Sequence, residues 1–178
     1  MILGLVAAKN NSNRFPGKNT YIYKDEPLFW HSVKLLLDSD KIDDVYVITD
    51  SDYIKSYCEE RGVRVIWRPK NATRDEDKLI SILRFGYYSL DKEYDIIVTL
   101  MANCPGHSVD VIDNSIDLLK DKGLREVRSF NKSGNESGIL IFSKEILQNN
   151  FDISYYIGGV MSDVKEIHYE GDMTFNVQ

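Results

Sequence analysis

The strongest constraint on the fold is a regular alternation between apolar, strand-like runs and amphipathic, helix-like segments. The strand-like runs are residues 3–8, 45–49, 63–67 and 95–101. The helix-like segments between them, with apolar residues at helical spacing, are residues 27–37, 51–61 and 75–90. Strands and helices that alternate through short connections predict right-handed βαβ units and a mostly parallel sheet.

The remainder of the chain adds one more helix and then becomes strand-rich. Ser108 is placed to cap a helix with an apolar stripe, which Gly123 would end. Beyond it we expect strands over residues 125–130, 137–142 and 165–169, with a short helix over 144–148. The predicted fold is therefore a Rossmann-like, three-layer α/β/α domain spanning residues 1–178. Its sheet is mixed and mostly parallel, with one antiparallel strand.

Composition excludes several classes of partner. The 178 residues include 22 basic and 28 acidic ones, a net charge of −6, which argues against a nucleic-acid or anionic membrane surface as the main partner. No apolar run approaches the roughly 18 residues of a membrane span. The apolar residues directly after Met1 lack a basic region before them and indicate a buried strand rather than a signal peptide. Two cysteines make no disulfide framework, so we expect a cytoplasmic protein.

The loop after the first strand is the most informative segment. Ligands of parallel sheets bind beyond the carboxyl ends of the strands, and residues 7–19 hold three cations and four asparagines at such a place. A triphosphate needs cations and backbone N–H groups of this kind. The loop is not a Walker A motif, because Ser12 replaces its first glycine and Asn19 its Ser/Thr, and it has no Gly-x-Gly-x-x-Gly. From the loop alone, phosphate binding and a solvated polar loop both stay open.

This loop resembles the opening motif of the acylneuraminate cytidylyltransferases, the CMP-sialic acid synthetases and their relatives. That motif reads roughly Ala-Arg-x-x-Ser-Lys-Arg-apolar-Pro-x-Lys-Asn after an apolar strand. The residues that match it in register are Ser12, Arg14, Pro16, Lys18 and Asn19. Lys9 stands where the family has Arg, and Asn13 where it usually has a phosphate-binding Lys.

Weaker matches follow in the family's order along nearly the whole chain. They are residues 26–28 (Glu-Pro-Leu), 47–51 (Val-Ile-Thr-Asp-Ser), 65–69 (Val-Ile-Trp-Arg-Pro), 100–105 (Leu-Met-Ala-Asn-Cys-Pro) and 137–142 (Ser-Gly-Ile-Leu-Ile-Phe). The resemblance implies a fold like that of nucleotide-diphospho-sugar transferases. It also implies an activity, the attack of a hydroxyl of an acidic sugar on the α-phosphorus of CTP with release of pyrophosphate, for cell-surface polysaccharide synthesis.

The resemblance also implies roles for individual residues. Lys18 and Arg14 would be catalytic and neutralise the phosphates, with Mg²⁺ as cofactor. Asn19 and Arg68 would contact the base, ribose or phosphate, and Asn103 would lie near the nucleotide. The full set of predicted nucleotide-binding residues is Ala8, Lys9, Asn10, Ser12, Asn13, Asn19, Arg68 and Asn103.

Three departures from the family pattern matter. Asn176 and Gln178 stand where the family has an Asp-x-Asp metal pair, and amides bind Mg²⁺ less well than carboxylates do; Asp172 is a substitute ligand if the register differs. Residues 125–136 replace a long insertion that builds the family's dimer arm and sugar pocket, so a homodimer of this chain would use another surface. His107 stands at a usual Arg, and the acidic residues 75–77 replace a Ser/Thr-rich cytidine contact.

Other functions stay open beside the cytidylyltransferase. The changes at Asn13, Asn176 and Gln178 fit a nucleotide-binding module that has lost catalysis and serves a regulatory or partner role. Asp50 and Asp52 fit either the metal motif of a nucleotide-sugar glycosyltransferase or an ordinary helix start. Cys104 follows a strand, as a nucleophile would, with His107 close in sequence, although structural packing is the commoner role.

Overall fold

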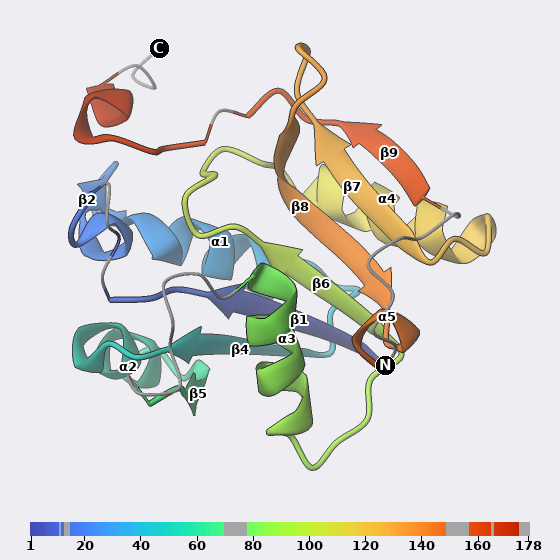
Figure 1. Cartoon of the computed structure of the whole chain (residues 1–178), viewed down its shortest axis with the longest axis horizontal. Coiled ribbons are helices and arrows are strands. Elements are labelled where there is room, and N and C mark those ends of the chain that lie inside the picture. The colour runs from blue at the N-terminus through green and yellow to red at the C-terminus, as the bar shows by residue number, and fades with distance from the viewer. Residues whose placement is uncertain (11, 13–14, 70–77, 149–156, 165, 175–178) are drawn as a thin grey trace.

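The computed structural model describes residues 1–10, 12, 15–69, 78–148, 157–164 and 166–174. Its first half follows the predicted alternation (Figure 1). The strands are β1 (Ile2–Ala7), β4 (Asp44–Thr49), β5 (Arg64–Trp67) and β6 (Ile96–Leu100), and the helices between them are α1 (Leu28–Leu37), α2 (Asp52–Glu59) and α3 (Leu79–Tyr88). Between β1 and α1 lie the short helix η1 (Lys18–Thr20) and a small hairpin of β2 (Ile22–Tyr23) and β3 (Glu26–Pro27).

The second half completes a seven-stranded sheet in the order β5-β4-β1-β6-β8-β7-β9. The remaining elements are α4 (Val109–Asp121), β7 (Glu126–Phe130), β8 (Glu136–Ser143), α5 (Glu145–Gln148), β9 (Ile157–Met161) and η3 (Glu170–Thr174). β8 runs antiparallel to both β6 and β7, whereas β9 pairs with β7 in parallel. β8 is thus the antiparallel strand of an otherwise parallel sheet, which confirms the predicted architecture.

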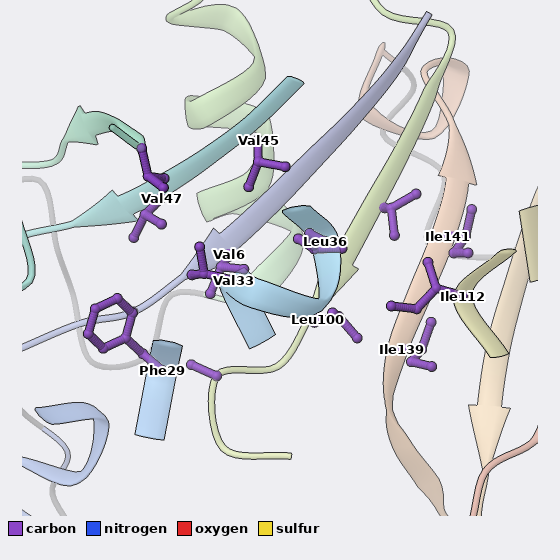
Figure 2. Packing of buried hydrophobic residues seen from close by; sticks show 14 of the residues in the cluster. Val6, Phe29, Val33, Leu36, Val45, Val47, Leu100, Ile112, Ile139 and Ile141 are labelled. Atoms are coloured by element: carbon purple, nitrogen blue, oxygen red, sulfur yellow. The ribbon is translucent and has the colours of Figure 1, made fainter. Parts of the chain in front are cut away.

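Helices cover both faces of the sheet because the central strands are apolar on both sides. On β1, Ile2 and Val6 face a cluster formed with α1, α2 and α4, part of which Figure 2 shows. Leu3 and Leu5 face the opposite way, toward α3 and α5. Because alternate residues face opposite sides, helices pack on both faces of the sheet and three layers result. The polar loops lie at the carboxyl ends of the strands.

The amino end of β4 holds a saturated cluster of charged and polar groups. The carboxylate of Asp44 is 11% exposed; it accepts hydrogen bonds from Lys92 Nζ at 2.6 Å and Tyr94 Oη at 2.7 Å and pairs with Arg64. Burial alone would raise the pKa of Asp44, but these three donors outweigh it and hold the pKa well below its usual value. The cluster links β4 to β5 and to the segment before β6.

Two details of the sequence-based prediction are wrong. Residues 166–169 are not a strand, and His168, interpreted as a structural histidine within one, lies next to Glu166 in an irregular segment. The strand is β9 instead, whose Gly158 and Gly159 hide the period-two pattern that reveals other strands. A Cβ at Gly158 would lie 2.5 Å from Leu124 Cδ1, so that a larger residue there would require the Leu124 side chain to move. The predicted start of the third helix at residue 75 lies outside the described residues.

A short connection, residues 131–135, joins β7 to β8. Asn131 organises it, because its side-chain Oδ1 accepts the backbone N–H groups of Ser133 and Asn135 at 3.0 Å each. No helix in the described part of the chain is long and apolar enough to cross a membrane.

Candidate active site

A cleft of about 240 Å³ opens at the carboxyl ends of β1, β4 and β6, and one turn of α3 lies along its side. Parallel sheets place their ligands at this position. The lining residues are Ala7, Ala8, Lys9, Ser12, Lys18, Asn19, Ile48, Thr49, Asp50, Arg68, Leu79, Ile82, Leu100, Met101, Ala102 and Asn103.

The loop after β1 is held against its neighbours at three points. The Ala8 N–H extends the β1–β4 pairing to Ile48 O at 2.9 Å, and the Asn10 N–H donates to Asp50 Oδ1 at 2.7 Å. Asn19, which is 7% exposed, folds its side-chain amide back to donate to Lys9 O at 2.8 Å. The described residues 8–10 and Asn19 of the predicted phosphate loop are therefore held beside the cleft, and Asn19 joins the two ends of the loop.

Lys18 of η1 and Asn103 of the loop after β6 reach the same acceptor. Lys18 Nζ donates to Ile167 O at 3.2 Å, and Asn103 Nδ2 donates to the same oxygen at 3.1 Å. The Ile167 N–H in turn donates to Asn103 O at 2.8 Å. The Ile167 side chain is fully buried in a small cluster with Phe15, Tyr23, Leu28 and Met173. The segment around Ile167 therefore fixes both predicted site residues.

Cations gather around the cleft of this acidic protein. Arg68 directly follows β5, is 6% exposed, and is anchored through its backbone N–H to Thr49 O at 2.8 Å. Lys9, Lys18 and Arg68 line the cleft together with the carboxylate of Asp50. Three positive groups and one negative group around a concave space favour an anionic ligand that also carries neutral polar groups.

Most of the predicted nucleotide-binding residues come together. Ala8, Lys9, Ser12, Lys18, Asn19, Arg68 and Asn103 all line the cleft. Asn10 contributes through its backbone, which joins the loop to Asp50. Asn13, Arg14, Asn176 and Gln178 lie outside the described residues, as do the acidic residues 75–77. Their predicted roles stay predictions.

The predicted metal site is not assembled by the described residues. They contain no group of three or more His, Cys, Asp or Glu side chains that could hold a metal ion. Asp172 Oδ2 accepts the backbone N–H groups of His168 at 2.9 Å and Tyr169 at 3.0 Å, so this carboxylate orders the turn into η3.

Cys104 is packed under the site rather than presented to it. Its side chain is fully buried, and burial raises the pKa of the thiol, which disfavours a reactive thiolate. Gly138 of β8 approaches it so closely that a Cβ there would lie 2.5 Å from Cys104 Sγ. His107 donates to or accepts from Ser162 Oγ at 2.8 Å through Nδ1, and burial lowers the pKa of His107 to about 4. Both side chains therefore serve packing around the loop that presents Asn103.

The sequence prediction did not include several residues of the cleft. For Asp50 the sequence predicts only a metal ligand or a helix start, and Ser51 indeed caps α2, with its Oγ accepting the Ile54 N–H. Leu79 and Ile82 belong to the apolar stripe of α3, and no local pattern marks which end of that stripe meets the cleft. The only sequence signal that points to Asp50 as a cleft residue is its position at the carboxyl end of β4. Thr49 shares that position, so the signal does not single out Asp50.

Comparison with solved structures defines the class of fold. A structure of CMP:2-keto-3-deoxy-manno-octonic acid synthetase in complex with CTP superposes with a TM-score of 0.77, covering 97% of this chain and 95% of that one at 14% identity. The fold is thus that of α/β nucleotidyltransferases. The model of the cytidylyltransferase family matches residues 3–153, and the chain belongs to this family.

Curated relatives are similar over about two thirds of the chain. The CMP-N,N'-diacetyllegionaminic acid synthase of Legionella pneumophila is 28% identical over 126 residues, which are 68% of this chain and 54% of that protein. The 3-deoxy-manno-octulosonate cytidylyltransferase of Thermodesulfovibrio yellowstonii is 30% identical over 122 residues, 66% of this chain and 47% of that protein. The chain therefore spans about half the length of the curated relatives it matches.

Proposed function

We propose that this chain transfers CMP from CTP to an acidic sugar, a nonulosonic or ketodeoxy acid, and releases pyrophosphate. The observation that carries the proposal is the convergence of Lys9, Lys18 and Arg68 on one cleft at the carboxyl ends of β1, β4 and β5. A triphosphate carries about four negative charges, and these cations supply the charge-assisted hydrogen bonds that it needs. Named relatives act on sugar acids of both kinds, which supports this substrate class.

In the proposed reaction a hydroxyl oxygen of the sugar bonds to the α-phosphorus and releases its proton to solvent, while the bond from that phosphorus to the oxygen bridging it to the β-phosphorus breaks. Pyrophosphate leaves with the electron pair and its negative charge. Lys18 and Arg14 would hold the phosphates and offset the charge that develops on the leaving group. Positioning and electrostatics therefore supply the rate, and no covalent intermediate with the protein is needed.

Mg²⁺ belongs to the proposal as the ion bound with CTP, where it neutralises phosphate charge. Asn176 and Gln178, with Asp172 as the substitute, are its predicted ligands in this chain. Both cysteines are buried free thiols, which supports the proposal of a reducing cytoplasm as the site of action. There the protein would supply a CMP-activated sugar for a cell-surface polysaccharide.

The first test is calorimetric titration of CTP with Mg²⁺ into the wild type and Lys18→Ala. We expect the variant to lose about 1.5–3 kcal/mol of binding free energy, roughly 10-fold to 100-fold in Kd, because a charged donor to phosphate is removed. Lys122→Ala, at an exposed lysine beyond α4, is the matched control and should bind like the wild type. Equal CTP affinity in the wild type and Lys18→Ala would reject the site.

The second test measures pyrophosphate release with a panel of nonulosonic and ketodeoxy acids. Release with any of them establishes the transfer and identifies the sugar. CTP binding without release across the panel would instead favour a nucleotide-binding module without catalysis, the alternative that the amides at positions 176 and 178 motivate.

A further inference from the structure

Asp50 is the one carboxylate among the described residues that line the cleft, and the proposed phosphate contacts give it no task. It directly follows β4, the strand next to β1, and lines the cleft. Its Oδ1 accepts the Asn10 N–H at 2.7 Å, so it lies at the root of the loop assigned to the phosphates. A negative charge at this place opposes phosphate binding, so Asp50 fits a different part of the nucleotide.

The turn that carries Asp50 is held rigid by its neighbours. Thr49 Oγ1, 2% exposed, accepts the Ser51 N–H at 3.1 Å, and Ser51 Oγ accepts the Ile54 N–H at 3.4 Å. The Arg68 N–H adds a bond to Thr49 O at 2.8 Å. Asp50 is thus presented from a fixed backbone, as a group that recognises a ligand atom needs to be.

The order of the strands indicates which part of the nucleotide Asp50 meets. The run β5-β4-β1-β6 places the second major strand beside the first, the third outside it and the fourth on the other side. Doubly wound dinucleotide-binding sheets have this order. In them the phosphates sit on the loop after the first strand, and an acidic residue further along the chain accepts a hydrogen bond from the ribose. Asp50 stands in a comparable relation to the loop of residues 8–19.

The chemistry of a carboxylate suits this position. An ionised Asp accepts only, with two oxygens and about four lone-pair directions, so the bond from Asn10 leaves capacity for further donors. The vicinal hydroxyls of a ribose are neutral donors one bond-length from the sugar ring. We propose that Asp50 accepts hydrogen bonds from the ribose hydroxyls of the bound nucleotide and makes the cleft selective for ribonucleotides over 2′-deoxyribonucleotides. This inference rests on the proposed function, which supplies the nucleotide.

The test is the ratio of the Kd of 2′-deoxy-CTP to that of CTP, measured by calorimetry for the wild type, Asp50→Asn and Asp50→Ala. We expect a wild-type ratio of roughly 10 to 100, the cost of a missing hydrogen bond to a charged group. In Asp50→Ala the ratio should fall to about 1, whatever happens to the two affinities separately. Asp50→Asn keeps one acceptor oxygen for the Asn10 N–H and should give an intermediate ratio.

The control is Asp52→Asn, which removes an exposed carboxylate two residues away on α2 and should keep the wild-type ratio. The titrations are repeated in EDTA, since a metal ligand would lose its effect with the metal and a ribose contact would not. A wild-type ratio near 1, a ratio that vanishes in EDTA, or an unchanged ratio in Asp50→Ala would overturn the inference and leave CTP binding standing. Failure of every nucleotide to bind would reject the proposed function itself.

Discussion

The two ends of β4 each carry an aspartate, and the two residues have very different surroundings. At the amino end, Asp44 is met by Arg64, Lys92 and Tyr94 from neighbouring segments. At the carboxyl end, Asp50 meets a backbone N–H of a loop and shares an open cleft with cations.

The difference shows how one sheet separates stability from binding. The charged groups at the amino end, Asp44, Arg64 and Lys92, pair with one another and so link neighbouring strands and segments. Charges at the carboxyl end converge on a concave space that an anionic ligand can fill. Changes at the first end should therefore alter unfolding and leave binding intact, whereas changes at the second end should alter binding.

Gly138→Ala should have the largest effect, and it should change both the free energy of unfolding and the affinity for CTP. Its φ of +98° is unfavourable for alanine, and the added Cβ would collide with Cys104 below the loop that presents Asn103. We expect a loss of about 3 kcal/mol in the free energy of unfolding, together with weaker CTP binding. Urea denaturation and calorimetry measure both.

Gly123→Ala is the matched control for that variant. Gly123 also has a positive φ, +59°, but nothing lies within 4 Å of its added Cβ. It should cost only about 1–2 kcal/mol from backbone strain and leave CTP affinity unchanged. If both variants bind CTP like the wild type, the contact between Gly138 and Cys104 does not shape the site.

As the pH falls, the stabilising contribution of neutral His107, in the segment after β6, should be lost before that of ionised Asp44 at the amino end of β4. Burial lowers the pKa of His107 to about 4, against about 6.5 in the unfolded chain, so the folded state binds fewer protons between these values. Stability is then lost as the pH falls from about 6.5 to about 4, by roughly 3 kcal/mol. The lowered pKa of Asp44 keeps its contribution intact until the pH falls below about 4.

Urea denaturation between pH 7 and pH 4 checks this, with His107→Gln as the comparison. The variant lacks the titrating ring, so its unfolding free energy should decline less steeply over that range. Parallel slopes for the wild type and the variant would mean that His107 does not cause the loss.

Asp44→Ala should lower the free energy of unfolding by about 1–3 kcal/mol, because two cations and a phenol lose their common partner. CTP affinity should stay within about twofold of the wild type, since the cluster lies at the opposite end of the strand. Asp95→Ala is the control: that carboxylate pairs with the amino terminus but is 67% exposed, so its loss should cost at most about 1 kcal/mol. A large loss of CTP binding in Asp44→Ala would contradict the idea that the amino end of β4 contributes to stability and not to binding.

Cys104→Ala should have the smallest effect on function. The thiol is fully buried and burial raises its pKa, so it offers no nucleophile. We expect unchanged pyrophosphate release and about 1 kcal/mol less stability from the small cavity. Iodoacetamide should also leave the folded wild type unmodified at Cys104. A Cys104→Ala protein that folds but releases no pyrophosphate would contradict this prediction and indicate a catalytic role for Cys104.

The parallel core and most of the cleft could be predicted from sequence because both follow from local patterns. Apolar runs mark β1, β4, β5 and β6, and parallel pairing brings their carboxyl ends together, which gathers Lys9, Arg68 and Asn103. The resemblance to the cytidylyltransferases then assigned these residues to a nucleotide.

The parts that could not be predicted depend on contacts between distant segments. β9 contains adjacent glycines and lacks an apolar alternation, so only its pairing with β7 defines it. Ile167 meets Lys18 and Asn103 through its backbone, which no side-chain pattern can reveal. Asp50 was visible as a residue, but its role as the partner of the Asn10 N–H depends on the path of a loop forty residues earlier.

The bond from Lys18 to Ile167 has a consequence for how the protein is made. The two residues are 149 positions apart, so at ordinary rates of translation the ribosome adds Ile167 roughly 7–30 s after Lys18. During that interval a nascent chain can hold the sheet strands β1, β4 and β6 without the acceptor that fixes Lys18 and Asn103. If the proposed function holds, nucleotide binding in its final geometry is a late event of synthesis, because the bond that fixes Lys18 needs Ile167.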